Sequence, residues 1–237
     1  MKNRAFTLFE LLVVVVIIVL LIAILQVALK AARELGYRTA CLNNQHQIGF
    51  AVQNYGNAEL GYLPFSNWDA LDSQWVNAPG WLYKAPLAFN QATQTWNKPT
   101  DVETGALWPY LNSLKVYHCP MDLPPYKNVF AHPLSSYVFN GAVNGFGARI
   151  PSWRASQIKR VDAVLLWEVD ENSPNPQLAY NDGATRPDSG VSRRHATGYT
   201  MTQFDGAAIY VTNTQFNREG QLSPGRFWCN PGTANGH

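Results

Sequence analysis

The fold of this chain is decided near its N-terminus, by Phe6-Thr7-Leu8-Phe9-Glu10 and the unbroken apolar run from Leu11 to Leu25 that follows. At about 1.5 Å of rise per residue, a helix from Phe6 to Leu29 is long enough to cross a hydrocarbon core of roughly 30 Å. Basic residues lie on both sides of it, which favours a membrane helix and leaves its orientation undecided by charge. These residues are Lys2, Arg4, Lys30 and Arg33.

Three interpretations of this stretch compete. A cleaved secretory signal needs small residues beyond the apolar run, and Val27-Ala28-Leu29-Lys30 is a poor site of that kind. A plain transmembrane anchor fits the length but leaves Glu10 unexplained, because a carboxylate in a spanning helix is costly and usually has a functional partner. The third interpretation accounts for Glu10.

Residues 5–25 closely resemble the class III signal of type IV prepilins and type II secretion pseudopilins. The features shared are a basic leader, a Phe, a Glu four positions later and a long aliphatic run. The resemblance implies that a prepilin peptidase cleaves between Ala5 and Phe6 and methylates the new amino group, although the family usually has Gly where this chain has Ala5. It also implies that Glu10 of one subunit pairs with the amine of Phe6 on a neighbour, which would set the register of assembly.

The helix is expected to continue beyond the membrane, because the first proline is Pro64 and the apolar residues become periodic after Leu25. The periodic positions are Ala28, Ala31, Ala32, Leu35, Leu42, Ile48, Val52 and Tyr55. A stop is predicted near Gly56. We therefore divide the chain into a leader (1–5), an apolar transmembrane and assembly helix (6–29), its amphipathic continuation (30–57) and a globular head (58–237).

A second resemblance covers the head. It is similar to a large bacterial pseudopilin-like family (DUF1559-like) whose signature is a His, nine residues and then Asp-Gly, as in His195, Asp205 and Gly206. Further matching elements are Cys41 to Gly49 at the helix end, Cys119-Pro120-Met121-Asp122 and Ser136-Tyr137-Val138-Phe139-Asn140. The resemblance implies a pilin-like α+β fold in which the long helix packs on an antiparallel sheet with long loops. From the residues themselves, the apolar segment from Ala163 to Val169 predicts a buried strand, and the polar residues 213–237 predict an extended C-terminal segment.

Asp205-Gly206 also has a purely local explanation. It separates two strand-like segments, 199–204 and 207–211, and Asp-Gly is favoured in a type I′ hairpin turn. The dipeptide and His195 are therefore interpreted as structural. The rival interpretation is an anchored hydrolase that uses His195 and Asp205, which predicts a pocket holding both side chains. Since no serine or cysteine nearby has the context of a nucleophile, we expect that the protein is not an enzyme.

The three cysteines, Cys41, Cys119 and Cys229, are far apart and lack the CxxC spacing of zinc or redox motifs. In an exported head, one disulfide and one free thiol are expected, and all three pairings stay open. No cofactor is expected, and calcium is the alternative, with candidate ligands in an acidic, Asn-rich segment. These are Asp170, Glu171 and Asp182, and solvated loop acids are the default interpretation.

The chain has 237 residues, 46% of them hydrophobic, and a formal net charge of +2, which does not suggest nucleic-acid binding. The hypothesis is a filament subunit, held first in the inner membrane by a single pass with its head in the periplasm and then assembled into a pseudopilus or surface filament. Its expected partners are copies of itself, other pilin-like subunits, prepilin peptidase and the inner-membrane assembly platform. The alternative is a membrane-anchored carbohydrate-binding module, suggested by the tryptophans Trp68, Trp75, Trp81, Trp96 and Trp108.

Overall fold

A computed structural model describes residues 7–68, 80–84, 99–124, 134–148, 151–169 and 183–237. The chain divides into two compact units, Met1–Tyr37 and Arg38–His237. The boundary lies inside the segment predicted as the amphipathic continuation. The first unit contains the apolar start of the long helix, and the second, called the head below, contains the sheet.

The long helix α1 spans Leu8–Ala58, as predicted, and ends two residues beyond Gly56. Its C-terminus closes with a bond from the amide of Gly61 to the carbonyl of Gly56 (2.7 Å), while Leu60 and Gly61 have φ values of 53° and 87°. This six-to-one bond with a left-handed residue before it is the pattern of a Schellman cap, which satisfies carbonyls left over by the helix. The backbone can then turn back toward the head.

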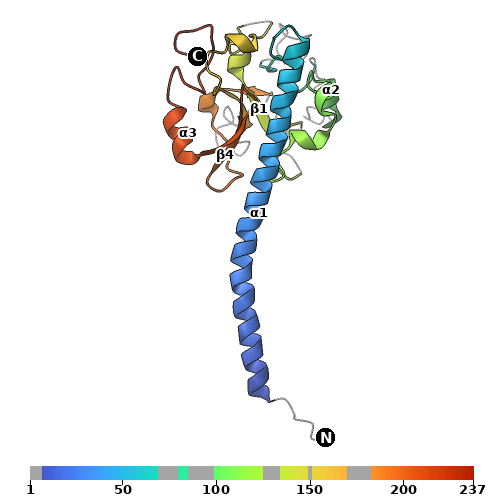
Figure 1. Cartoon of the computed structure of the whole chain (residues 1–237), viewed down its shortest axis with the longest axis vertical. Coiled ribbons are helices and arrows are strands. Elements are labelled where there is room, and N and C mark those ends of the chain that lie inside the picture. The colour runs from blue at the N-terminus through green and yellow to red at the C-terminus, as the bar shows by residue number, and fades with distance from the viewer. Residues whose placement is uncertain (1–6, 69–79, 85–98, 125–133, 149–150, 170–182) are drawn as a thin grey trace, which may run out of the picture. The chain divides into compact units, whose positions relative to one another are not determined.

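Within the head, one stripe of α1 is buried. Its members follow three- and four-residue steps, which place them on one helical face: Cys41, Gln45, Ile48, Gly49 and Val52. Gln45 was not predicted in this stripe; its amide donates to the carbonyl of Thr200 (3.1 Å), and Thr202 donates back to the carbonyl of Gln45 (3.1 Å). The head part of α1 therefore lies against the sheet (Figure 1).

The sheet has five strands in the order β3-β1-β2-β4-β5. Their bounds are β1 Tyr137–Asn140, β2 Val164–Glu168, β3 Ala184–Thr185, β4 Gly198–Gln203 and β5 Ala208–Thr212. The α+β architecture is confirmed, and β2 lies where the apolar segment 163–169 predicts a buried strand. The pairings are antiparallel apart from that of β1 with β3, which is parallel.

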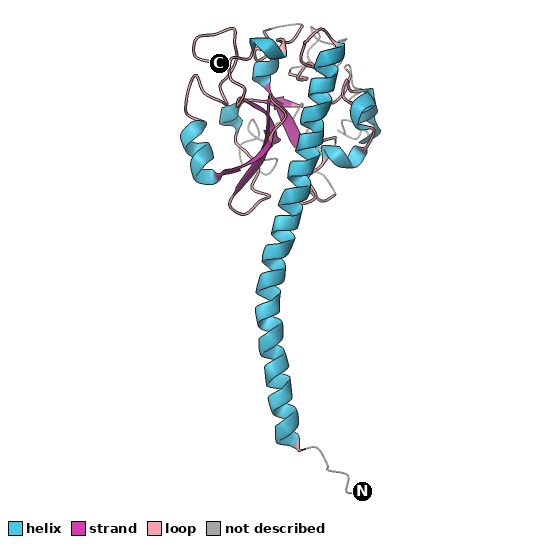
Figure 2. Ribbon diagram, in the orientation of Figure 1, coloured by secondary structure: helices cyan, strands magenta, loops and turns pink. Residues whose placement is uncertain are grey.

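Both faces of the sheet are covered. Alternation along β1 sends Tyr137 and Phe139 into a core shared with α1, and Val138 into a second core on the other face. The second core includes Phe216 of α3 (Asn213–Glu219) and Phe227 of the C-terminal segment. Figure 2 shows the sheet in magenta between the head part of α1 and α3. The remaining helices are short: η1 Pro99–Thr104, α2 Trp108–Leu111, η2 Leu114–Tyr117, η3 Gly141–Asn144, η4 Ala155–Gln157 and η5 Pro187–Ser189.

The β4–β5 hairpin differs from the prediction in its turn. Gly206 has φ 87°, but Asp205 is not among the residues with positive φ, so a type I′ turn is wrong. The amide of Gly206 instead bonds the carbonyl of Gln203 (2.9 Å), and Gln203 in turn donates to the carbonyl of Ala207 (2.9 Å). A three-residue hairpin loop, 204–206, that ends in the left-handed Gly206 fits this geometry. Asp205 stays exposed at this turn, where its carboxylate accepts from the amide of Ala207 (2.9 Å).

The C-terminal region also differs in part from the extended segment expected over residues 213–237. It begins with helix α3, because the side chain of Thr212 caps it by accepting from the amide of Gln215 (3.2 Å). Beyond α3 the chain returns to the sheet, where the carbonyl of Arg226 accepts from the amide of Val164 (2.7 Å).

The close approach of α1 to the hairpin yields a first prediction. A Cβ on Gly49 would lie 2.9 Å from Cγ2 of Thr202 and 3.1 Å from Cα of Gly206. Gly49→Ala should therefore destabilise the head by about 1–3 kcal/mol, despite the higher helix propensity of alanine. Gly36, which has nothing within 4 Å of its added Cβ, supplies the control. Thermal unfolding of both variants in detergent tests this, and equal melting temperatures for the two would contradict it.

Candidate assembly segment and buried polar cluster

The apolar start of α1 is exposed along its whole length. Every residue from Thr7 to Arg33 is exposed. The exposed fractions of Leu25 and Val27 are 64% and 74%. One window of this helix has a mean hydropathy of 3.5, with none of its residues buried. By length and composition α1 is able to cross a membrane, and its exposed apolar side chains require either lipid or other helices as cover.

Glu10 has a local partner at the start of α1. Its carboxylate oxygen Oε2 accepts from the amide (2.9 Å) and the hydroxyl (2.8 Å) of Thr7, and the hydroxyl of Thr7 accepts from the amide of Glu10 (3.2 Å). These reciprocal bonds form a capping box, for which Thr-x-x-Glu is the sequence signature. Glu10 therefore has a second, local role that was not predicted from the sequence. Both bonds from Thr7 use the same oxygen, Oε2.

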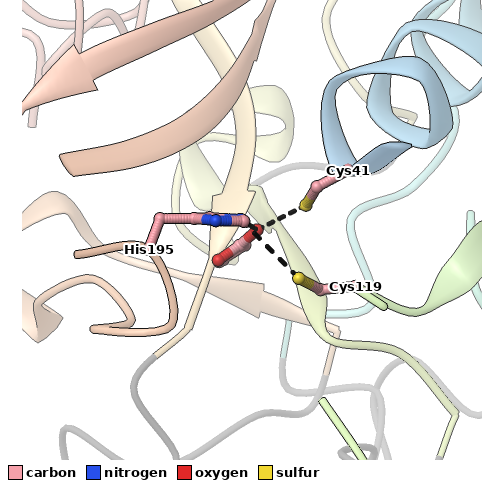
Figure 3. A group of neighbouring side chains, drawn as sticks. Cys41, Cys119 and His195 are labelled. Atoms are coloured by element: carbon pink, nitrogen blue, oxygen red, sulfur yellow. Dashed lines mark hydrogen bonds and ion pairs between the residues drawn. The ribbon is translucent and has the colours of Figure 1, made fainter. Parts of the chain in front are cut away.

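A second feature lies inside the head, where four side chains converge: Cys41, Cys119, Glu168 and His195. Their ligand atoms all lie within 4.8 Å of one another, and all four residues are buried. Figure 3 shows Cys41 reaching in from α1, with Cys119 and His195 pointing toward the same point from two loops. Glu168 is the last residue of β2. Four segments distant in the chain thus meet at one place.

The contacts within this cluster are short. The thiol of Cys41 donates to Oε1 of Glu168 (2.5 Å), and Nε2 of His195 lies 3.3 Å from the same oxygen. Nε2 of His195 is also 3.7 Å from the sulfur of Cys119. The hydroxyl of Thr200 donates to Oε1 of Glu168 (2.8 Å), so that this one oxygen collects three contacts.

Further polar groups surround the cluster. The hydroxyls of Tyr137 and Thr200 each lie 3.1 Å from the sulfur of Cys41. Arg194, beside His195, places Nη1 4.0 Å from Oε2 of Glu168 and donates from Nη2 to Asp122 (3.0 Å). Asp122 also accepts from the hydroxyl of Ser136 (2.6 Å). The cluster is therefore ringed by groups whose orientation is fixed by hydrogen bonds.

The electrostatics follow from this arrangement. Burial disfavours the carboxylate of Glu168, but the bond with His195 and the charge of Arg194 outweigh it and hold its pKa below the ordinary value. Burial likewise opposes a charge on His195, yet its contacts with Cys119 and Glu168 raise its pKa to about 10. The pKa of the Cys41 thiol is raised, chiefly by burial, whereas the neighbouring side chains of Cys41 and His195 lower the pKa of Cys119.

The structure brings together residues that carried the second resemblance. Cys41, Cys119 and His195 meet, and Asp122 and Ser136 lie at their edge. Asp205 does not join them, since it is exposed at the β4–β5 turn. A catalytic pair of His195 with Asp205 is therefore not what this fold builds.

Two participants were missed by sequence reasoning. Glu168 was expected only as part of a buried apolar strand, and Arg194 had no expected role. A signal for Glu168 was present: a single carboxylate inside the apolar segment Ala163–Val169 must be paired once that segment is buried. Its partner could not be named from the sequence.

The remaining predicted site residues are placed as follows. All three cysteines are free thiols here; Cys229 lies apart, with its sulfur 3.6 Å from the amide nitrogen of Asn140. The disulfide stays a prediction. Ala5 and Phe6, and the calcium candidates Asp170, Glu171 and Asp182, lie outside the described residues.

The tryptophans that suggested carbohydrate binding are in part core residues. Trp81 is fully buried and stacks on Phe139, with ring centroids 4.4 Å apart and an angle of 7°. Trp68 and Trp108 are half-buried, and Trp75 and Trp96 lie outside the described residues. A fully buried indole has no face for a sugar, so Trp81 acts in core packing.

Comparison with known proteins agrees with both resemblances. The family described as "Protein of unknown function (DUF1559)" matches residues 30–208, and the prokaryotic N-terminal methylation motif matches residues 1–25. No curated protein and no solved structure matches the chain significantly. Together with the apolar helix, the methylation motif indicates a prepilin-like protein with a membrane anchor.

Proposed function

Because the chain belongs to the DUF1559 family of proteins of unknown function and carries a prokaryotic N-terminal methylation motif, we propose that it is a filament subunit. The filament would be a type IV pilus-like fibre or a type II secretion pseudopilus. The observation that carries the proposal is the exposed apolar start of α1 joined to that motif. It supports a structural role rather than an enzymatic one.

The physical basis is the cover that this helix needs. Its apolar residues are exposed within the chain, so that water contact is avoided only in lipid or against other helices. A subunit waiting in the inner membrane has the first kind of cover, and a subunit in a filament has the second. Transfer from one to the other by an assembly platform keeps the apolar surface out of water throughout.

Processing is proposed to precede assembly. Prepilin peptidase would cleave between Ala5 and Phe6, leaving the head in the periplasm and a methylated amine on Phe6. The capping box then holds Glu10 at the start of the helix, with its oxygen Oε2 engaged by Thr7. The other oxygen, Oε1, is the one we assign to the amine of a neighbouring copy or of another pilin-like subunit.

The substitution Glu10→Gln separates the two roles of this residue. A glutamine at the third helical position still completes a capping box, but it lacks the charge needed to pair with an amine. We expect Glu10→Gln to keep the chain in the membrane while its recovery in sheared filaments from the host falls by roughly tenfold or more. Thr7→Ala is the matched control, since it removes the cap hydroxyl and keeps the carboxylate; its filament yield should fall much less.

N-terminal mass analysis of both variants and of the unmodified chain accompanies this test. Each should begin at N-methylated Phe6, which shows that a loss of filaments comes from assembly and not from failed cleavage. Normal filament yield from Glu10→Gln would refute the role of the charge. An intact Met1 on the unmodified chain purified from the host would refute the filament proposal as a whole.

A further inference from the structure

We propose that Cys41, Cys119, Glu168 and His195 form a structural zinc site inside the head. The proposal concerns the stability of the head and does not depend on filament assembly. It rests on the type of the four donors, on their mutual distances and on the groups that surround them.

The donor types suit zinc. Two cysteine sulfurs, an imidazole nitrogen and a carboxylate oxygen form a mixed set of four, which is the number that structural zinc sites use. Thiolate ligands favour zinc over calcium or magnesium, which prefer oxygen. The cysteines escape the usual sequence signature because 77 residues separate Cys41 from Cys119, whereas in zinc motifs they lie a few positions apart.

Three donor–donor distances are given above: Cys119 to His195, His195 to Glu168 and Cys41 to Glu168. The first two fit a tetrahedral ion. With zinc–sulfur bonds of about 2.3 Å and zinc–nitrogen or zinc–oxygen bonds of about 2.0–2.2 Å, a tetrahedron separates sulfur from nitrogen by about 3.6 Å and nitrogen from oxygen by about 3.4 Å. The sulfur of Cys119 lies 3.7 Å from Nε2 of His195, and that nitrogen lies 3.3 Å from Oε1 of Glu168.

The third contact, in which the thiol of Cys41 donates its proton to Oε1 of Glu168, is 2.5 Å and therefore shorter than the separation of two ligands on one zinc ion. Replacing that proton by a zinc ion would move them to about 3.6 Å apart. The adjustment needed is on the order of 1 Å, within reach of a rotation of either side chain. Metal binding at this site therefore displaces protons from the donors.

The surroundings supply a second, independent argument. Oε2 of Glu168 is buried and has no hydrogen-bond partner among the residues that the structure describes. A buried oxygen without such a partner is costly, and a metal ion offers it or its neighbour Oε1 a ligand bond. Two thiolates, one carboxylate and a neutral imidazole around Zn²⁺ give the site a net charge of −1. Nη1 of Arg194, 4.0 Å from Oε2 of Glu168, compensates this charge.

Such a site would join four segments that are distant from one another in the sequence. Cys41 belongs to α1, Cys119 follows η2, Glu168 ends β2 and His195 precedes β4. An ion held by all four fixes the long helix to the sheet by ligand bonds in addition to packing. The free energy of metal binding then becomes part of the free energy of folding.

The test uses the full chain purified in detergent without chelators. Elemental analysis should find one zinc ion per chain, and Cys41→Ser and Cys119→Ser should each lose it. The matched control is Cys229→Ser, which removes a thiol outside the cluster and should keep its zinc. Removing zinc from the unmodified chain should lower its melting temperature by roughly 5–10 °C, and adding zinc back should restore it.

A spectroscopic measurement covers the case in which a serine variant does not fold. Cobalt(II) exchanged into the unmodified chain should give the intense thiolate-to-metal charge-transfer band and the visible bands of a tetrahedral site. Weak bands of a six-coordinate ion would overturn the proposal. A Cys41–Cys119 disulfide in metal-free protein from the host would also overturn it. The same holds if the chain has free thiols but binds no zinc when zinc is added, or if both serine variants retain zinc.

Discussion

Replacing Glu168 with alanine is expected to lower the melting temperature of the head by roughly 10–15 °C, corresponding to about 3–5 kcal/mol of stability. The carboxylate is fully buried and collects contacts from Cys41, Thr200 and His195, with Arg194 nearby. Its removal leaves a cationic imidazole and a guanidinium in the interior with less compensation. Breaking one side of a buried ion pair is among the most destabilising changes that a core can undergo.

Glu103→Ala supplies the matched control, because Glu103 is an exposed carboxylate of η1 and its removal should change stability by no more than about 0.5 kcal/mol. Both variants are to be measured as full chains in detergent, by near-ultraviolet circular dichroism during heating. The loss should appear with or without zinc, because the carboxylate offsets the buried charge of Arg194 in either state. Equal melting temperatures for Glu168→Ala and Glu103→Ala would show that the cluster does not stabilise the head.

Trp81→Ala should be similarly damaging, with an expected loss of about 3–5 kcal/mol. The indole is fully buried, stacks on Phe139 and lies 6.2 Å from the ring of Tyr117. Its Nε1 donates to the carbonyl of Gly183 (2.7 Å). The substitution therefore creates a large cavity and removes a buried hydrogen bond together.

Two further variants locate the origin of that loss. Trp81→Phe keeps an aromatic ring for stacking and should lose less than half as much stability. Trp68→Ala removes a half-buried ring that meets Phe146 edge-on at 5.7 Å, so its effect should also be smaller. If Trp81→Ala unfolded at the same temperature as the unmodified chain, the indole would not be a core residue. The carbohydrate-binding alternative would then regain support.

Much of the fold was predictable because its strongest signals are local. The apolar run after Glu10, the absence of proline before Pro64 and the periodicity after Leu25 predicted the long helix, and α1 spans Leu8–Ala58. Strand β2 was likewise predicted from its apolar sequence. The position of the turn at Asp205-Gly206 was predicted correctly, but its type was not. The number of loop residues, and with it the turn type, depends on how β4 and β5 pair.

Other features depend on contacts that no local pattern contains. The parallel pairing of β1 with β3 joins residues 45 positions apart, Phe139 with Ala184 and Asn140 with Thr185. Helix α3 was missed because its seven residues are mostly polar, so hydrophobic periodicity could not reveal it. It is stabilised by the cap of Thr212 and by the burial of Phe216 against the sheet.

The amino-acid sequence by itself determined the apolar helix and the methylation motif, since each depends on residues within a few turns of one another. Only the tertiary structure decided the buried cluster. Cys41, Cys119, Glu168 and His195 come from separate elements, and their side chains meet because α1 and two loops pack against the end of β2. Their spacing along the chain carries no trace of this, because the chemistry of a buried site depends on distances through space.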